Sequence, residues 1–460
     1  MVIRNSNWQT KHLPAPKQQF EGARYMLKLV SLILLVFLAI TPASALENLF
    51  NPYLTKKPPE GIRVLDSEKH GDVELQHILF DSRTVQTANG PVRSEVSAAI
   101  TRPVQKGRHP GILLLHGGAG MAQEDLALNW AQRGFVVVAP DLPGIADPTK
   151  VRNGSGAWKQ VKYGEGFFTV SPDATASVLF DGVLAAVQSL YLLRSLPEVN
   201  SHRIGVTGVS WGGYTTIMVA GLAGKDIRAA YSIYGSGHYD LGSAFQGGLK
   251  SLSQEQAETW LHQLDARNYA PSIKARFFEA AASNDTFFWI PAVSSTLAEI
   301  HAPKNLVFAP NSDHWMDVPG GCEHTKEGVP HDNSWMTMQV VYFEYLLMGK
   351  GKPFPQVLDE AARPGKDNSD SVRFHVKDAV GTADATVYYS RSGTPWKTRK
   401  WLPAKVERRG RWYQAQIPVG SDWFALATDG RPVTVSSGVH TGSDRTLDTS
   451  VTQEVSTESK

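Results

Sequence analysis

Short apolar runs alternate with longer helix-like stretches through the middle of the chain. Runs rich in valine, leucine, alanine and phenylalanine end at glycine, proline or polar residues: Gly111–His116, Phe135–Pro140, Arg203–Val209, Ala229–Tyr234, Ala275–Ala282 and Asn305–Pro310. Their length and composition predict strands that are buried on both faces of a parallel sheet. The stretches Val178–Arg194, Gln254–Asp265 and Trp335–Met348 predict helices. This alternation predicts an α/β fold, with a mostly parallel central sheet and helices on both of its faces.

The pattern differs on either side of this region. Residues 72–102 form extended segments with turn residues and predict antiparallel strands that lead into the sheet. After residue 366, short and often alternating runs are separated by turn glycines: Ser371–Lys377, Ala385–Ser390, Trp401–Val406, Arg411–Ile417 and Trp423–Ala427. This spacing predicts a small all-β domain, sandwich-like, over 369–436. We expect a linker at 351–368, and a disordered tail at 437–460 because few apolar residues occur there.

The amino-terminal segment has the features of a secretory leader. The 12-residue apolar run Leu29–Ile40 follows Lys28 and precedes Pro42-Ala43-Ser44-Ala45. A basic start, a short apolar core and small residues at the end predict a signal peptide, 1–45, that is cleaved after Ala45. Translation could also start at Met26. The mature catalytic domain would then span 46–350 and be secreted or periplasmic, with no membrane span left after cleavage.

Composition and charge narrow the classes of partner. The chain has 460 residues, 46 basic against 44 acidic, so it lacks the basic surface that binding to nucleic acid requires. The single cysteine, Cys322, excludes an internal disulfide framework. Cys322, His324, His331 and Asp332 match no strong zinc spacing, and we expect no metal there.

The most informative motif is GVSWGG, residues 208–213. It contains G-x-S-x-G at the end of a predicted strand, and a helix-compatible stretch follows. This context is typical of a nucleophile elbow, a tight strand-to-helix turn that exposes Ser210 in a strained conformation. Gly208 and Gly212 keep Cβ atoms out of the turn. An ordinary glycine-rich βα turn remains the alternative.

A serine nucleophile needs a base and an orienting acid. Asp285 follows the run Ala275–Ala282, and His314 follows Asn305–Pro310, so both are expected at the carboxyl edge of the sheet. The order Ser210, Asp285, His314 is that of α/β-hydrolases. Asp285 could instead cap a helix. The other candidates are Asp313 and Asp317 for the acid, and His301, His324 and His331 for the base.

Acyl transfer also needs an oxyanion hole. We expect one donor to be the backbone N–H of Trp211, after the nucleophile, and the other to come from His116-Gly117-Gly118-Ala119-Gly120. Gly118 is the preferred second donor and Ala119 the alternative, whereas His116 is expected to be structural.

A dinucleotide site is a rival interpretation of the same loop. Gly118 and Gly120 follow a strand, and Asp141 ends the next one. The third glycine of the fingerprint is replaced by Gln123, and this hypothesis leaves the serine, acid and histidine unexplained.

The segments LLLHGGAG, SLPEVNSHRIGVTGVSWGGY, SNDTFFW and APNSDHW resemble the α/β-hydrolase superfamily over about residues 85–350, in particular the acetyl xylan esterase and dienelactone-hydrolase-like branch. The prolyl-oligopeptidase catalytic domain is similar in the same segments. The resemblance implies the α/β-hydrolase fold, Ser210 as nucleophile, His314 as base, Asp285 as acid, Gly118 and Trp211 at the oxyanion hole, and no cofactor. Gly118 replaces a bulky residue of several acetyl esterases.

Aromatic residues suggest pocket walls. Phe287, Trp289 and Trp315 flank the acid and the base, and Trp158 lies in a segment that could line the pocket. Trp396, Trp401, Trp412 and Trp423 could form a carbohydrate platform, although core packing also explains them.

We expect an exported serine hydrolase that acts on a small-molecule or carbohydrate ester. The alternatives are a serine peptidase of the prolyl-oligopeptidase type and a non-enzymatic binding protein that uses the β domain.

Overall fold

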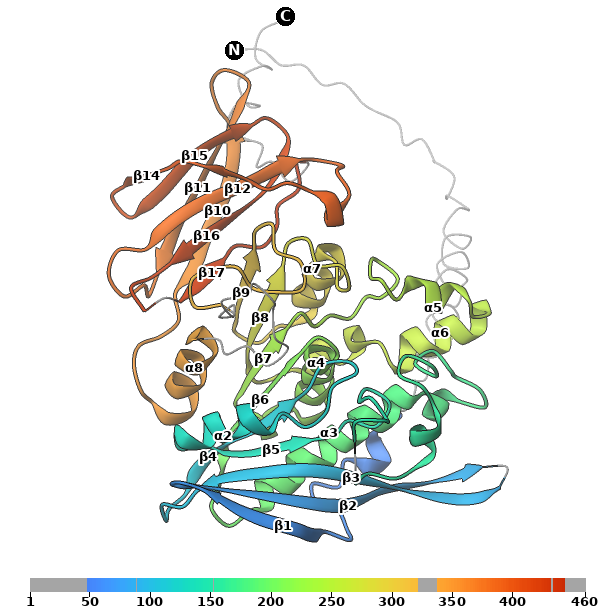
Figure 1. The fold of residues 1–460 in the computed structure, drawn as a ribbon. Coiled ribbons are helices and arrows are strands. Elements are labelled where there is room, and N and C mark those ends of the chain that lie inside the picture. Colours follow the sequence, from blue (N-terminus) through green and yellow to red (C-terminus); the bar gives the residue numbers. More distant parts are fainter. Residues whose placement is uncertain (1–47, 88, 152, 322–336, 432, 443–460) are drawn as a thin grey trace, which may run out of the picture. The chain divides into compact units, whose positions relative to one another are not determined.

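The computed structural model describes residues 48–321, apart from 88 and 152, and 337–442, apart from 432 (Figure 1). The predicted signal peptide, the segment with Cys322, His324, His331 and Asp332, and residues 443–460 of the predicted tail lie outside the described residues. The chain divides into two compact units, Met1–Asn51 and Pro52–Lys460, and the second unit holds the elements described below.

The central sheet has nine strands in the order β1-β2-β3-β5-β4-β6-β7-β8-β9. Its strands are β1 (Arg63–His70), β2 (Val73–Thr87), β3 (Gly90–Pro103), β4 (His109–Leu115), β5 (Val136–Pro140), β6 (Val199–Val209), β7 (Ala229–Ile233), β8 (Arg276–Ala282) and β9 (Lys304–Ala309). The pairs from β1 to β5 are antiparallel, and those from β5 through β4 to β9 are parallel. Each predicted inner strand is confirmed. The sequence pattern missed β1 because every residue of this edge strand is exposed.

Helices cover both faces of this sheet. Along β6, Gly205 and Thr207 face α8 (Thr337–Phe343), and the Gln339 side chain of that helix donates to the Thr207 hydroxyl at 2.6 Å. Gly208 faces α4 (Trp211–Ala223) on the opposite side. The other helices are α2 (Glu124–Gln132), α3 (Val178–Ser195), α5 (Gln246–Lys250), α6 (Gln254–Gln263) and α7 (Ile290–Glu299), with a π-helical turn at Glu344–Met348.

Helix α3 is long and apolar enough to cross a membrane, but its most apolar window is 83% buried, as in a core helix.

The carboxyl-terminal domain consists of two four-stranded antiparallel sheets, β10-β11-β15-β14 and β13-β12-β16-β17. Its strands are β10 (Gln356–Pro364), β11 (Ser369–Lys377), β12 (Asp384–Arg391), β13 (Leu402–Ala404), β14 (Val406–Arg409), β15 (Trp412–Pro418), β16 (Ser421–Thr428) and β17 (Thr434–Ser436). The predicted linker, 351–368, therefore contains strand β10. The sequence pattern did not predict this strand because the segment is rich in charged residues and proline. Residues 437–442 of the predicted tail also pair with β16, since the backbones of Trp423 and His440 exchange hydrogen bonds of 2.9 and 2.8 Å.

The tryptophans of this domain do not form one platform. Trp401 and Trp423 are 1% and 3% exposed and pack in the core, which was the alternative to a carbohydrate platform. Trp396 lies against the Arg399 guanidinium, whose carbon is 3.7 Å from the ring centroid. Trp412 belongs to the other sheet, where Arg373 and Arg411 cover it.

Candidate active site

Ser210 occupies a strained turn between β6 and α4. Its backbone has φ 59° and ψ −119°, a region that residues with a side chain rarely adopt. The turn is close to the end of β4, because a Cβ atom at Gly212 would lie 2.4 Å from the Leu115 carbonyl oxygen. The Ser210 N–H donates to the Ile233 carbonyl at 2.7 Å, which attaches the turn to β7. The geometry is that of the predicted nucleophile elbow.

Asp285 and His314 meet at the carboxyl ends of β8 and β9. The Nδ1 atom of His314 lies 2.8 Å from Oδ2 of Asp285, and the carboxylate is buried at 3% exposure. Tyr234 directly follows Ile233, the last residue of β7, whose carbonyl accepts the Ser210 N–H. The Tyr234 ring lies 4.5 Å from the His314 ring, centroid to centroid. The structure therefore brings the predicted serine, acid and base to one edge of the sheet. With Nδ1 held by Asp285, Nε2 of His314 is the nitrogen left to accept a proton from Ser210.

Asp285 also caps the turn that follows it. Its Oδ1 accepts the N–H groups of Phe287 at 2.7 Å and Phe288 at 3.0 Å. The cap and the catalytic acid, which the sequence presented as alternatives, are two roles of one carboxylate. These contacts fix the carboxylate so that Oδ2 remains directed to the histidine.

The structure places the competing acids and bases elsewhere. Both oxygens of Asp313 accept hydrogen bonds from Thr286, one from its N–H at 2.6 Å and one from its hydroxyl at 2.8 Å. Asp317 is exposed, and the exposed His301 precedes β9, at the opposite end of that strand from His314. His324 and His331 lie outside the described residues.

The loop after β4 is held in a fixed conformation. The Ala119 N–H donates to the Ile145 carbonyl at 2.9 Å, so this amide is occupied and Gly118 is the better second oxyanion donor. A Cβ atom at Gly118 would lie 2.6 Å from Cδ1 of Trp211, which shows how closely the two predicted donor residues approach. The structure therefore brings Gly118 and Trp211, the two predicted donor residues, side by side.

His116 stabilises this loop, as the sequence suggested. Its Nδ1 lies 2.7 Å from the Gly117 carbonyl, and its Nε2 accepts the Leu142 N–H at 2.9 Å. Nδ1 must then carry the proton, because a carbonyl can only accept. Burial lowers the pKa of His116 to about 4, so the ring is neutral at pH 7. Both ring nitrogens are engaged, which excludes His116 as the catalytic base.

Asp141 also supports the loop, contrary to its role in the dinucleotide hypothesis. Its Oδ1 accepts the Ala122 N–H at 2.7 Å, and the side chain is buried. Burial raises its pKa to about 6. A carboxylate that is turned into the loop is not exposed to bind a ribose.

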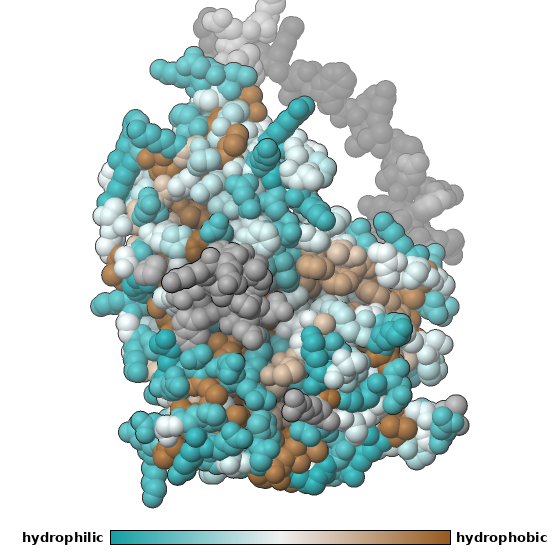
Figure 2. All heavy atoms as spheres, in the orientation of Figure 1, coloured by the Kyte–Doolittle hydropathy of each residue, from teal (hydrophilic) through white to brown (hydrophobic). Residues whose placement is uncertain are grey.

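An aromatic cluster surrounds Trp211 beside the elbow. The ring of Trp211 contacts the rings of Phe167, Tyr239, Phe245 and Phe288 at centroid distances of 4.8, 5.8, 4.7 and 6.1 Å. Figure 2 shows hydrophobic surface between the positions of α5 and α7 in Figure 1, where the connecting segments expose Leu241 and Phe287. The sequence did not single out Tyr239 and Phe245, because their spacing in the chain gives no sign that they meet Trp211.

The predicted pocket residues have different environments. Phe287 is 40% exposed, and its ring lies 4.9 Å from that of His314. Trp289 is half-buried and donates from its indole to the Thr286 carbonyl at 3.1 Å. Trp315 lines a cavity next to the histidine loop. Trp158, however, is 2% exposed and packs within its own loop, where its indole donates to the Ser155 carbonyl, so the expectation of a pocket wall gives way to core packing.

Glu279 is a buried acid that the sequence analysis did not identify. It lies in β8 at 1% exposure, and its Oε1 accepts the Gly235 N–H at 3.1 Å. Burial holds the pKa of Glu279 well above its usual range, and the nearby charge of Asp285 raises it further. Glu279 therefore keeps its proton to a higher pH than an exposed glutamate does. Its sequence context, RFFEAAA, gave one signal: a charged residue inside an otherwise buried strand.

Comparison with known proteins agrees with this geometry. Residues 62–236 match the acetyl xylan esterase (AXE1) family. A search of curated proteins finds no similar sequence. Acetyl xylan esterase 1 from Thermoanaerobacterium sp. JW/SL YS485 is similar in structure, with 22% identity over 58% of this chain and 86% of that chain, and a TM-score of 0.48.

Two further solved structures are similar over a comparable part of the chain. Acetyl xylan esterase from Paenibacillus sp. R4 has 19% identity over 57% of this chain and 86% of that chain, with a TM-score of 0.45. Porphyromonas gingivalis dipeptidyl peptidase 4 has 15% identity over 54% of this chain and 40% of that chain, with a TM-score of 0.38. The sheet order and the elbow are those of the α/β-hydrolase fold, and residues 62–236 are similar to the acetyl xylan esterase family.

Proposed function

We propose that the protein is an exported serine esterase that cleaves carboxylic esters, such as acetyl esters, through an acyl-enzyme on Ser210. The observation that carries the proposal is the 2.8 Å contact between His314 and Asp285, on loops that meet beside the strained Ser210 turn. The match of residues 62–236 to the acetyl xylan esterase family favours an ester over a peptide substrate. The predicted signal peptide places the activity in the periplasm or outside the cell.

The proposed reaction assigns a role to each of these residues. The Ser210 Oγ attacks the acyl carbon while Nε2 of His314 takes the hydroxyl proton, and the N–H groups of Gly118 and Trp211 stabilise the oxyanion. The bond to the alcohol oxygen then breaks, and His314 returns the proton to that oxygen. Water attacks the acyl-enzyme with His314 again as base, which releases the carboxylic acid and restores the serine.

A fluorophosphonate probe and a substrate panel test this function. We expect the probe to label the mature protein at Ser210 and to leave the Ser210→Ala variant unlabelled, because the probe reacts with an activated serine. On p-nitrophenyl acetate, Ser210→Ala and His314→Ala are each expected to lower kcat by roughly 10⁶-fold. Labelling is read by intact mass, and turnover by release of nitrophenolate.

The panel separates the alternatives. Acetylated sugars and peptide anilides belong beside the nitrophenyl esters, since turnover of the anilides alone would identify a peptidase of the prolyl-oligopeptidase type. Equal labelling of wild type and Ser210→Ala, or no labelling of either, would show a binding protein and not an enzyme.

A further inference from the structure

The carboxyl-terminal β domain is more basic than the rest of the chain. Residues 351–442 contain 14 lysines and arginines against nine aspartates and glutamates, whereas the remaining residues contain 32 against 35. The nearly balanced charge of the whole chain therefore conceals one domain with a net positive charge. Such an asymmetry between the parts of a chain points to an anionic partner for the basic part.

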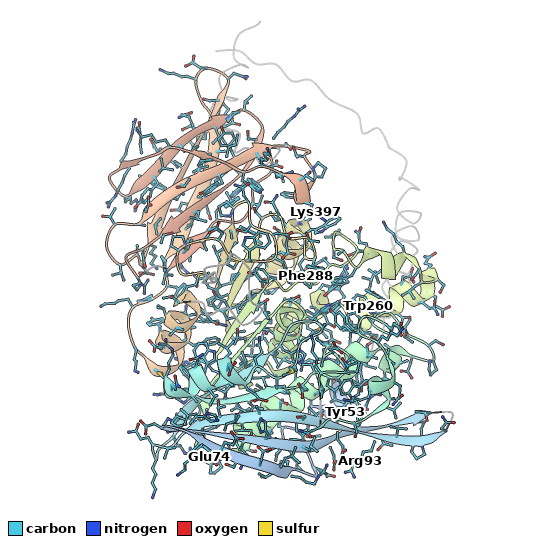
Figure 3. The ribbon with its side chains drawn as sticks, viewed as in Figure 1. Tyr53, Glu74, Arg93, Trp260, Phe288 and Lys397 are labelled. Carbon is cyan, nitrogen blue, oxygen red and sulfur yellow. The ribbon has the colours of Figure 1, made fainter. Side chains whose placement is uncertain are left out.

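The two sheets of this domain have different surroundings. Hydrogen bonds join the hydrolase domain to β17 and to the segment 394–402, which connects β12 with β13 in the same sheet. Figure 3 labels Lys397 in this segment, where its carbonyl accepts the Asn284 amide at 3.4 Å. Strands β14 and β15 of the other sheet lie on the side of the β domain that is farther from the hydrolase domain (Figure 1). The described residues of the hydrolase domain therefore leave the outer face of that sheet uncovered.

Alternation along β11 and β15 defines this outer face. The positions of the inner face are buried and apolar: Val372, Phe374, Tyr413, Ala415 and Ile417. The positions between them are partly exposed, and there Arg373 pairs with Gln414 and His375 with Trp412. Strand β14 adds Arg409, which lies opposite Trp412 on its other side. The outer face is thus polar and basic around a single tryptophan.

Trp412 holds two arginines on this face. The guanidinium carbons of Arg373 and Arg411 lie 4.8 and 5.0 Å from the centroid of its ring. Neither guanidinium forms a hydrogen bond or an ion pair with a described residue. Stacking on an aromatic ring uses the flat face of a guanidinium and leaves its terminal N–H groups free to donate. Two cations that repel each other are therefore held beside one ring, and an anion that binds both would relieve the repulsion.

The carboxylates nearest to these arginines are already engaged. Glu407 pairs with Arg409 at 3.1 Å, and Asp359 lies 3.1 Å from Nδ1 of His375. The remaining neighbours along β11 and β15 are polar and uncharged: Ser371, Gln414 and Gln416. Forked cations suit carboxylates, and amides and hydroxyls can both donate to and accept from the hydroxyl groups of a sugar. The flat surface of a sheet can accommodate both kinds of contact along an extended chain.

We propose that this surface, the Trp412 face, binds an acidic polysaccharide, a chain of sugar rings that carry carboxylates. The Trp412 face consists of Ser371, Arg373, Arg411, Trp412, Gln414 and Gln416. The two guanidiniums bind carboxylates, and the amides bind sugar hydroxyls. Phosphates of a membrane or of a nucleic acid would also attract the arginines, but neither partner requires the amides beside them. The site is separate from the triad, so the proposal does not depend on the esterase function.

A matched pair of polymers tests the class of ligand with the full-length protein. Polygalacturonate and its carboxyl-reduced form share one backbone and differ in charge. With both polymers immobilised for surface plasmon resonance, we expect the affinity for polygalacturonate to be at least roughly tenfold higher and to fall as salt screens the arginines. Equal affinity for the two polymers would overturn the proposal. Equal affinity for double-stranded DNA, or for vesicles of phosphatidylglycerol, would overturn the assignment to a polysaccharide.

Charge-matched variants locate the site. Arg373→Gln with Arg411→Gln is expected to weaken polygalacturonate binding roughly tenfold. Arg391→Gln with Lys397→Gln removes two exposed cations of the other sheet and its connecting segment and is expected to keep the wild-type affinity. Trp412→Leu leaves the net charge unchanged and is expected to weaken binding several-fold, because the arginines lose the ring that positions them.

Urea unfolding shows that each variant is folded. Binding that survives in the Arg373 and Arg411 double variant would overturn the proposal, as would an equal loss in the control pair. Unchanged affinity in Trp412→Leu would overturn the role of the ring.

Discussion

At the scale of single residues, the site depends on buried polar groups that each satisfy more than one requirement. Asp285 accepts two backbone N–H groups through one oxygen and the histidine through the other. His116 uses both ring nitrogens to fix the loop after β4. Burial in β8 raises the pKa of Glu279, although its carboxyl group still accepts the Gly235 N–H. The sequence pattern could suggest Asp285 and His116 as site residues. Only the fold shows which partner each carboxylate oxygen and each ring nitrogen binds.

The protonation of Glu279 predicts a pH-dependent stability. Its pKa in the folded protein lies above the usual 4.5, so the unfolded chain loses this proton first as the pH rises. The stability that is present below about pH 4.5 then decreases toward the folded-state pKa, by up to about 1.4 kcal/mol per pH unit. Glu279→Gln keeps an oxygen for the Gly235 N–H and has no proton to lose. We expect its unfolding free energy, relative to wild type, to rise with that slope above pH 4.5.

Urea unfolding of both proteins at a series of pH values measures this difference. Other titrating groups affect both proteins alike, so the difference isolates Glu279. A difference that stays constant from pH 4 to 8 would mean that Glu279 ionises normally in the folded state.

At the scale of elements, the segment between β5 and α3 completes the oxyanion loop. The Ala119 N–H and the Gly120 carbonyl pair with backbone groups of residues 145 and 147 in this segment. Farther along it, the Tyr163 hydroxyl fills the space that a side chain at position 118 would take, since a Cβ atom there would lie 1.9 Å from that oxygen. A residue from another loop thus occupies the space that a side chain at position 118 would take.

Gly118→Ala is therefore expected to impair catalysis more than binding. The added methyl group would displace Tyr163 and Trp211 and shift the donor, lowering kcat by roughly ten- to 100-fold while KM changes less. Combining it with Tyr163→Ala should restore part of kcat, because one of the two clashes is removed.

Gly247→Ala provides the control for this substitution. It adds the same methyl group in α5, where no atom lies within 4 Å of the new Cβ, and is expected to leave kcat unchanged. A wild-type kcat in Gly118→Ala would contradict the assignment of this amide as a donor.

At the scale of the whole molecule, the β domain and the hydrolase domain share a polar interface. The Phe308 N–H of β9 donates to the Ser436 hydroxyl of β17 at 2.9 Å, and the Thr434 hydroxyl donates to the Pro319 carbonyl at 2.7 Å. Three asparagines add contacts: Asn284 and Asn311 beside the triad, and Asn305 at the other end of β9, where its amide donates to the Pro355 carbonyl at 2.9 Å. The catalytic domain and the β domain that the sequence predicted are therefore joined by hydrogen bonds near both ends of β9.

Variants of these asparagines distinguish a loss of overall stability from a loss of triad positioning. Asn284→Ala, Asn311→Ala and Asn305→Ala each remove a hydrogen bond between the domains and should each cost about 1 kcal/mol of unfolding free energy. Only Asn284→Ala and Asn311→Ala are expected to lower kcat, roughly tenfold, because they release the loops of Asp285 and His314. Esterase kinetics and urea unfolding measure the two effects. If Asn305→Ala lowered kcat as much as the other two, the loss would reflect general destabilisation and not triad positioning.

The sequence by itself determined the inner strands, the core helices and the order of the triad. Buried parallel strands read as continuous apolar runs, and an elbow needs its glycines at fixed offsets from the serine, so both leave local signals. The same logic failed for β1 and β10, which are held by pairing with β2 and β11 and not by an apolar pattern of their own. It also failed for Trp158, because the sequence of its loop does not tell whether the indole lines a pocket or packs within the loop.

Only the tertiary structure decided which groups meet. The Ala119 N–H is occupied because the fold places the Ile145 carbonyl beside it, and the pKa of Glu279 is raised because the fold buries it in β8. The loops of Asp285 and His314 contact the β domain because Asn284 and Asn311 bind a segment about 100 residues later in the chain. Contacts of this kind depend on the packing of whole domains, for which spacing along the chain carries no signal.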